Sequence, residues 1–218
     1  MLKKDIEIGK LTIAYIQKSD PFLPGFTAYL PEYQRRAILP AASVARKNRI
    51  GEYTWALMVS EMETGDVQLS QNVESYFRQL MDCFLLASYL GDSAIKIKRV
   101  AHVSGSQFVK VAVDSENGSD PVVACQQACE HMKKYTDFKI IIIKYDRDKT
   151  QYIKNALYPC PQKAIQEVIY KQDGDVKKAI VSVKDRYIGL CKGDKKRNVT
   201  TASKLVGLYI AIQSANGE

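Results

Sequence analysis

Residues 139–144 read Lys-Ile-Ile-Ile-Ile-Lys, and this run constrains the fold more than any other feature of the chain. Four consecutive isoleucines favour a β-strand, because β-branched side chains suit a pleated backbone. A strand with one solvated face alternates apolar and polar residues, whereas a strand covered on both faces is apolar throughout. We therefore predict a strand here, in a sheet whose outer face is covered locally by N-terminal strands or by C-terminal elements.

Strand and helix patterns surround this run in a regular order. Alternation of residues predicts strands over 52–62, 94–103 and 107–115, and helical spacing predicts helices over 70–91 and 120–135. Ser70 and Gly91 stand where the caps of the first helix are expected. The order strand, helix, strand, strand, helix, strand is that of the ferredoxin-like βαββαβ unit. No internal repeat is visible.

The predicted fold class is α+β, with a ferredoxin-like βαββαβ core, an N-terminal strand extension and a basic C-terminal α/β extension. We expect one continuous globular unit with an N-terminal extension over 1–51, the core over 52–148 and the C-terminal extension over 149–218. In the last part, helices are expected over 150–158 and 161–172 and strands over 176–184 and 186–193. Segment 200–215 is expected to be a helix or a strand. As a helix it would carry Ser203, Gly207 and Ala211 on one close-packing face, and it would then suit a homo-oligomer.

Positive charge is concentrated at one end of the chain. The formal net charge is +8, and residues 133–218 hold 18 of the 32 Lys and Arg residues but only 9 of the 24 Asp and Glu residues. Such segregation favours an anionic partner, most often nucleic acid. An acidic protein or an anionic membrane surface is the alternative partner. The cations expected to form one basic rim are Lys177, Lys178, Lys192, Lys195, Lys196 and Arg197.

Residues 52–146 resemble the RNA-recognition motif in the order of their predicted elements. In that family the third strand carries a signature of glycines and exposed aromatic rings that stack on bases. Residues 104–111, Ser-Gly-Ser-Gln-Phe-Val-Lys-Val, match it at Gly105, Phe108 and Val109, whereas Ser106 and Val111 replace aromatic residues. The resemblance implies RNA binding across the sheet.

The two strands over 94–115 carry further residues of this predicted surface. If alternate valines of the second strand point inward, then Phe108 and Lys110 point outward, where Lys96 and Lys98 can join them. A ring among lysines is a partial platform for single-stranded nucleic acid.

The segment Asp146-Arg-Asp148-Lys-Thr150 resembles the first motif of haloacid-dehalogenase-type phosphatases, with Asp194 in the place of a later metal-binding residue. The resemblance implies a Mg²⁺-dependent phosphatase or nuclease as an alternative function. Only 46 residues separate Asp148 from Asp194, too few for the several βα units of that family. We therefore predict that Asp146 and Asp148 end the strand and cap the helix over 150–158, and we name no catalytic residue.

Other features restrict the class of protein. Five cysteines in scattered positions do not make a disulfide framework and suggest a reducing, cytoplasmic setting. No apolar run spans a bilayer, and no nucleotide-binding glycine loop or metal ligand set is present, so no cofactor is predicted. The leading hypothesis is a non-enzymatic protein that binds RNA or single-stranded DNA mainly through phosphates, with low sequence specificity. A self-assembling coat, nucleocapsid or scaffold protein is a variant of it.

Overall fold

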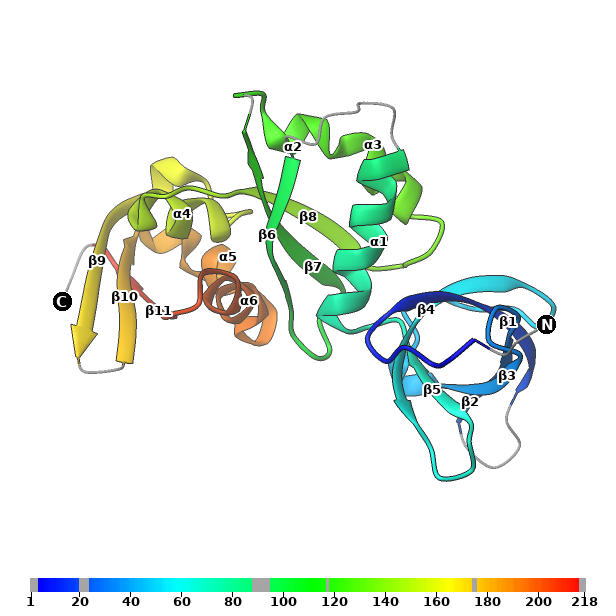
Figure 1. The fold of residues 1–218 in the computed structure, drawn as a ribbon. Coiled ribbons are helices and arrows are strands. Elements are labelled where there is room, and N and C mark those ends of the chain that lie inside the picture. The colour runs from blue at the N-terminus through cyan, green and yellow to red at the C-terminus, as the bar shows by residue number, and fades with distance from the viewer. Residues whose placement is uncertain (1–3, 20–23, 88–94, 117, 174–175, 216–218) are drawn as a thin grey trace. The chain divides into compact units, whose positions relative to one another are not determined.

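Two compact units make up the chain in the computed structural model, which describes residues 4–19, 24–87, 95–116, 118–173 and 176–215. The first unit holds residues 1–91 and 127–138, and the second holds residues 92–126 and 139–218. Both mix helices and strands (Figure 1), so the predicted α+β class is confirmed. The division of the chain after residues 51 and 148 stays a prediction. Within the described ranges, no helix has the length and apolar character needed to cross a membrane.

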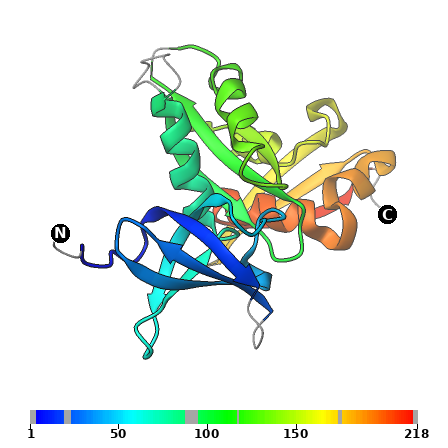
Figure 2. The same cartoon turned by 90° about the vertical axis from the view of Figure 1, so that its right-hand side faces the viewer.

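A closed barrel of five strands forms most of the first unit (blue to cyan in Figures 1 and 2). The strands are β1 (Leu11–Ser19), β2 (Gly25–Leu30), β3 (Arg35–Pro40), β4 (Tyr53–Glu61) and β5 (Val67–Ser70). Their order around the barrel is β1-β2-β3-β5-β4, with β3 and β5 parallel and the other neighbours antiparallel. Ile16, Leu30, Met58 and Leu69 are fully buried, so inward-facing side chains fill the interior.

The ferredoxin-like core predicted over residues 52–146 is not confirmed. Its first strand, β4, pairs with β1 and β5 inside the barrel, with Leu11 opposite Leu57 and Tyr15 opposite Tyr53. Alternation located this strand correctly, because a two-residue period shows which face is buried. The same period does not specify which strand pairs with β4. The prediction that this strand belongs to a sheet with the strands over 94–115 was therefore wrong.

Helix α1 (Glu74–Ala87) follows the barrel in the first unit, which also includes most of α3 (Gln126–Met132). Ser70, expected to cap α1, instead ends β5. The side chains of Tyr76 and Phe77 are fully buried. The Tyr76 hydroxyl donates a hydrogen bond to the carbonyl of Tyr135 (3.1 Å), and the Phe77 ring lies 5.4 Å from that of Phe138. These aromatic contacts hold α1 against the segment that follows α3.

The second unit contains two three-stranded sheets of the same topology. One has the order β6-β7-β8 and the other the order β11-β10-β9. In each, the first two strands form an antiparallel hairpin and the third strand pairs in parallel with the second. The strands are β6 (Ile95–His102), β7 (Phe108–Ser115), β8 (Lys139–Lys144), β9 (Ile165–Asp173), β10 (Val176–Val183) and β11 (Tyr209–Ser214).

A repeat of six elements underlies these sheets, although no internal repeat was visible in the sequence. The chain runs α1-β6-β7-α2-α3-β8 and then α4-β9-β10-α5-α6-β11, apart from short 3₁₀ turns. The helices not yet bounded are α2 (Pro121–Ala124), α4 (Lys149–Ala156), α5 (Ile188–Lys192) and α6 (Arg197–Val206). We call the two runs the first and the second repeat.

The isoleucine run forms β8, as predicted. Ile141 and Ile143 are buried in the core of the second unit, which also contains Ile153 and Leu205 from α4 and α6. The intervening Ile140 and Ile142 are half-buried. One face of β8 therefore packs in the core and the other is only partly covered.

Three secondary-structure predictions for residues 161–215 need correction. Residues 165–173 form strand β9 instead of a helix, because apolar residues three and four apart mimic helical spacing while pairing with β10 decides the structure. Residues 188–192 form α5 instead of a strand. Segment 200–215 is part helix and part strand, because α6 ends at Gly207 in the left-handed conformation. Ser203, Gly207 and Ala211 therefore do not share a helix face, and a homo-oligomer through this segment finds no support.

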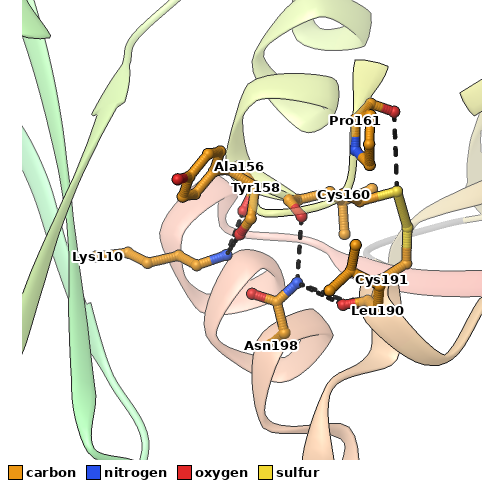
Figure 3. Close-up of a disulfide and its surroundings, with 9 residues drawn as sticks. Lys110, Ala156, Tyr158, Cys160, Pro161, Leu190, Cys191 and Asn198 are labelled. Atoms are coloured by element: carbon orange, nitrogen blue, oxygen red, sulfur yellow. Dashed lines mark hydrogen bonds between the residues drawn. A yellow bond between two sulfur atoms is a disulfide. The ribbon is translucent and has the colours of Figure 1, made fainter. Parts of the chain in front are cut away.

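The turn after α4 is held by buried polar contacts (Figure 3). The fully buried Lys110 Nζ donates to the carbonyls of Ala156 (2.5 Å) and Tyr158 (2.9 Å). The Asn198 amide donates to the carbonyl of Leu157 (3.2 Å). These donors bind carbonyls at the end of α4 and just after it, where the regular hydrogen bonds of a helix stop. Burial lowers the pKa of Lys110 to about 7.

A disulfide joins Cys160 in this turn to Cys191 in α5, with 5.1 Å between their Cα atoms (Figure 3). Cys83, Cys125 and Cys129 take no part in a disulfide. This pair could not be predicted, because an odd number of scattered cysteines does not indicate which two meet in space.

Lys110→Met tests the buried ammonium. The folded-state pKa of about 7 lies below the ordinary value of 10.5, so the unfolded chain binds more protons between these pH values. Stability of the second unit should therefore rise with pH, by about 2 kcal/mol from pH 7 to pH 9, and Lys110→Met should lack this rise. Urea unfolding followed by circular dichroism measures it. Trp55 fluorescence, which reports on the barrel, is the internal control. Parallel pH profiles for both proteins would contradict the prediction.

Candidate nucleic-acid interface

A tight basic loop connects α5 and α6 of the second repeat. It reads Gly193-Asp194-Lys195-Lys196, and Lys195 and Lys196 are exposed. Gly193 has φ +69°, and a Cβ there would lie 2.7 Å from Cβ of Asn198, so glycine is required. Lys195 and Lys196 also adopt positive φ, at 48° and 61°, which L-residues seldom do. The turn therefore presents two lysines on a backbone conformation that their own residue type disfavours.

A groove of about 260 Å³ lies between α6 and β11, beside this loop. Lys192 and Lys196 line it, together with Thr200 of α6 and Tyr209 of β11. The Ser203 hydroxyl accepts a hydrogen bond from the backbone N–H of Ile210 (3.0 Å), and this bond ties the start of β11 to α6. The groove combines cations, hydroxyl groups and an aromatic ring.

Tyr209 marks the strand side of the groove. Its side chain is 62% exposed, whereas the next residue, Ile210, is 3% exposed and faces the core. Lys178 stands opposite Tyr209 in the β10–β11 register, and its Nζ lies 5.9 Å from the centroid of the tyrosine ring. Lys178 therefore lies over the exposed ring, and Lys192 and Lys196 line the groove that the ring borders.

The other residues of the predicted basic rim lie apart from the groove. Lys177 lines a smaller hollow of about 130 Å³ with Lys149 and Tyr170. Arg197 is held by an ion pair with Asp194 (3.1 Å). Of the six residues of the predicted rim, Lys192 and Lys196 line the groove, and Lys178 lies over the ring of Tyr209 at its edge.

The predicted platform on the β6–β7 hairpin has a different structure from the one expected. Lys96 pairs with Glu116 (2.5 Å) and Lys98 with Asp114 (3.1 Å). Phe108 packs partly against the core of the second unit, and the outward orientation expected for Lys110 is wrong. The alternation that should have placed Phe108 and Lys110 outward fails because α6 packs on β7 and the turn after α4 binds the Lys110 ammonium.

The three aspartates of the alternative enzyme hypothesis have structural roles. Asp148 caps α4 by accepting a hydrogen bond from the Thr150 N–H (3.0 Å), as predicted, and Asp146 accepts one from the Asp148 N–H (2.9 Å). Asp194 pairs with Arg197. Across the part of the chain that the structure describes, no group of three or more His, Cys, Asp or Glu side chains could hold a metal ion.

Sequence reasoning missed Tyr209 and Thr200, which complete the groove. Both stand in the segment whose secondary structure was left open between helix and strand. The signal lay in Gly207, since a glycine after an amphipathic run favours the end of a helix. A helix that ends there makes Tyr209 the first residue of a strand.

These observations define a class of protein. Its members have a five-stranded barrel followed by two six-element repeats, with a basic groove in the second repeat. Among curated proteins, the chain matches transcription termination/antitermination protein NusA of several bacteria. It is 29% identical to that of Borreliella burgdorferi over 157 residues, which are 69% of this chain and 31% of the relative. The identity is 26% over 183 residues for Halalkalibacterium halodurans, covering 81% and 45%, and 32% over 132 residues for Thermus thermophilus, covering 58% and 33%. The chain spans less than half the length of these relatives.

No protein-family model matches the chain. Among solved structures, the crystal structure of APE1850 is similar, with a TM-score of 0.46 and 15% identity over 62% of this chain and 96% of that one. A multidomain protein with nucleic acid binding domains from Streptococcus pneumoniae has a TM-score of 0.30 and 19% identity over 39% of this chain and 31% of that one. Both TM-scores lie below 0.5, so neither likeness assigns a fold to this chain.

The positive φ of Lys196 predicts an unequal effect of two substitutions that remove the same charge. Alanine at φ 61° keeps the steric cost of a Cβ, whereas glycine removes it. Lys196→Gly should therefore be more stable than Lys196→Ala by about 1 kcal/mol. Urea unfolding of the two variants side by side measures the difference, with Lys163→Gly and Lys163→Ala as a matched pair at an exposed position of negative φ. Equal stabilities at position 196 would show that the loop does not hold this conformation.

Proposed function

We propose that this chain is an RNA-binding module related to transcription termination/antitermination proteins, and that the groove between α6 and β11 is its principal site. The observation that carries the proposal is a groove lined by Lys192, Lys196 and the exposed Tyr209, with Lys178 over the tyrosine ring. Lysines contact phosphates as point charges and position a nucleic acid without reading its sequence. The protein is proposed to act as a binding protein of the cytoplasm and not as an enzyme.

The charge distribution supports an anionic polymer as the ligand. The last 86 residues hold 18 of the 32 cationic residues and only 9 of the 24 acidic ones, and the groove lies within them. Neutralising several phosphates releases counterions and gives an affinity that falls steeply with salt. An acidic protein or an anionic membrane would use the same lysines and is an outcome of the test below.

The loop before α6 supports backbone recognition. Gly193-Asp194-Lys195-Lys196 resembles the Gly-x-x-Gly loop with which KH modules clamp about four nucleotides. The last position departs from glycine, but Lys196 keeps the left-handed conformation that glycine adopts readily. In the first repeat the corresponding junction contains only Cys125, which is buried between α2 and α3. We therefore assign binding to the second repeat.

The barrel supports a single-stranded ligand. Five-stranded barrels of the OB type bind oligonucleotides on the face of their second and third strands. The relatives are named as transcription termination/antitermination proteins, and a function in transcription favours RNA over DNA. Coat, nucleocapsid and scaffold functions find no support in these relatives.

Fluorescence anisotropy with labelled 20-mer single-stranded RNA and DNA tests the proposal. Affinity should fall steeply between 50 and 200 mM salt, since each lysine–phosphate contact contributes about 0.7 to the logarithmic slope for single strands. Replacing Lys178, Lys192 and Lys196 by alanine should weaken binding by about tenfold or more at 50 mM salt and lower the slope by about 2.

The matched control removes the same charge from three exposed lysines outside the groove, Lys47, Lys133 and Lys134. Its affinity and slope should stay close to those of the unmodified protein. Equal losses in both triple variants would contradict the assignment of the groove. No binding of any oligonucleotide by micromolar protein at 50 mM salt would overturn the proposed function, and flotation with anionic vesicles would then test the membrane alternative.

A further inference from the structure

We infer that Tyr209 is a stacking platform for one unpaired base, so that the groove prefers single-stranded RNA to duplex RNA. This inference rests on the proposed function and adds to it the part of the ligand that the lysines do not contact. A groove of lysines alone would accept any strand of phosphates, paired or unpaired. An aromatic ring at its edge requires a free base.

The exposure of Tyr209 is the first observation. At 62% its side chain is the most exposed aromatic ring among the described residues of the second unit, followed by Tyr158 at 51%. Tyr145 and Tyr152 instead pack on one another, with 5.0 Å between ring centroids. The ring of Tyr209 contributes little to the core, whose member at this end of β11 is its neighbour Ile210.

The placement of the ring is the second observation. Tyr209 begins β11 immediately after the helix cap at Gly207, and Ser203 fixes the start of the strand through its bond to the Ile210 N–H. The side chain therefore projects from an anchored backbone and not from a long loop. A ring on a fixed backbone loses little conformational freedom when a base stacks on it.

The surrounding charges are the third observation. Lys178 lies over the ring with its Nζ 5.9 Å from the centroid, and Lys192 and Lys196 line the same groove. A nucleotide whose base stacks on Tyr209 has its flanking phosphates within a cationic surrounding. Aromatic rings interleaved with cations are the usual composition of sites for single strands, and stacking tolerates any base sequence.

Duplex RNA does not offer this contact. Its bases are stacked on one another, and sequence-tolerant proteins meet the helix through its phosphates and 2′-hydroxyl groups. The groove should therefore prefer single-stranded RNA to a duplex of the same length, and the preference should depend on Tyr209.

An abasic double-mutant cycle on the full-length chain tests the inference. Anisotropy at 50 mM salt compares a labelled 12-mer of single-stranded RNA with a 12-mer of the same backbone in which stable abasic spacers replace every base. The unmodified protein should bind the abasic strand about 5- to 100-fold more weakly. Tyr209→Ala should lose a similar factor on the normal strand and should bind the abasic strand as the unmodified protein does. Tyr209→Phe should retain most of the affinity.

Tyr158→Ala is the matched control, because it removes another exposed ring of the same unit from outside the groove. If Tyr209→Ala lowers the affinity for the normal and the abasic strand by the same factor, the ring acts through the fold. If it changes neither affinity, no base stacks on the ring. Either result overturns the inference while leaving the lysine groove and the proposed function intact. Failure of the unmodified protein to bind either strand would overturn the proposed function itself.

Discussion

The second unit depends on the contact between the ammonium group of Lys110 and the carbonyls that end α4. An uncompensated charge in a protein interior is costly, and the carbonyl end of a helix carries partial negative charge that offsets part of this cost. Lys110 comes from β7 of the first repeat, whereas Ala156 and Tyr158 belong to the second. The contact therefore joins the two repeats through polar groups that neither could leave unpaired. The turn that it fixes also carries Cys160 and accepts the hydrogen bond from Asn198.

Asn198 links the turn after α4 to the basic loop before α6. Its amide donates to carbonyls on both sides of the helix entry, at Leu157 and Cys191, while its Cβ leaves no room for a side chain at Gly193. Asn198 consequently ties the start of α6 to the turn after α4 and to the end of α5. Lys195 and Lys196 lie between Gly193 and the start of α6, and both hold positive φ. A mobile loop of the same composition would lose more conformational entropy on holding a phosphate backbone.

Much of the local structure could be predicted from the sequence, because periodicity reports directly on burial. The runs around Trp55, Ile97, Val111 and Ile141 form strands where alternation or continuous apolarity placed them, and Asp148 caps α4 as its spacing required. Strand partners could not be predicted in the same way, since β4 would bury the same side chains in either sheet. The errors at residues 165–173 and 188–192 arose because short segments satisfy two periods at once and tertiary pairing decides between them.

The residues of the candidate site could be predicted where their exposure depends on local sequence, and could not where it depends on distant parts of the chain. The lysines of the basic loop were found from composition, because a cluster of like charges between two apolar segments is exposed in almost any fold. Lys110 was misplaced, because its burial depends on a turn nearly fifty residues away in the chain. Tyr209 was missed because Gly207 marks where the helix ends but not whether the tyrosine that follows is exposed or buried.

The two repeats share a topology but differ at their helix junctions, and the packing around α6 bears on the binding role proposed for the second repeat. Helix α6 contacts its own strand β11 and also β6 and β7 of the first repeat. Lys204 donates to the carbonyl of His102 (2.9 Å), and the guanidinium of Arg99 lies beside Gly207 at the helix end. The first repeat, whose helix junction contains no loop, thus supports the helix that forms one wall of the groove. A groove built on a helix packed from two sides needs little reorganisation to accept a strand, so more of the interaction energy remains as affinity.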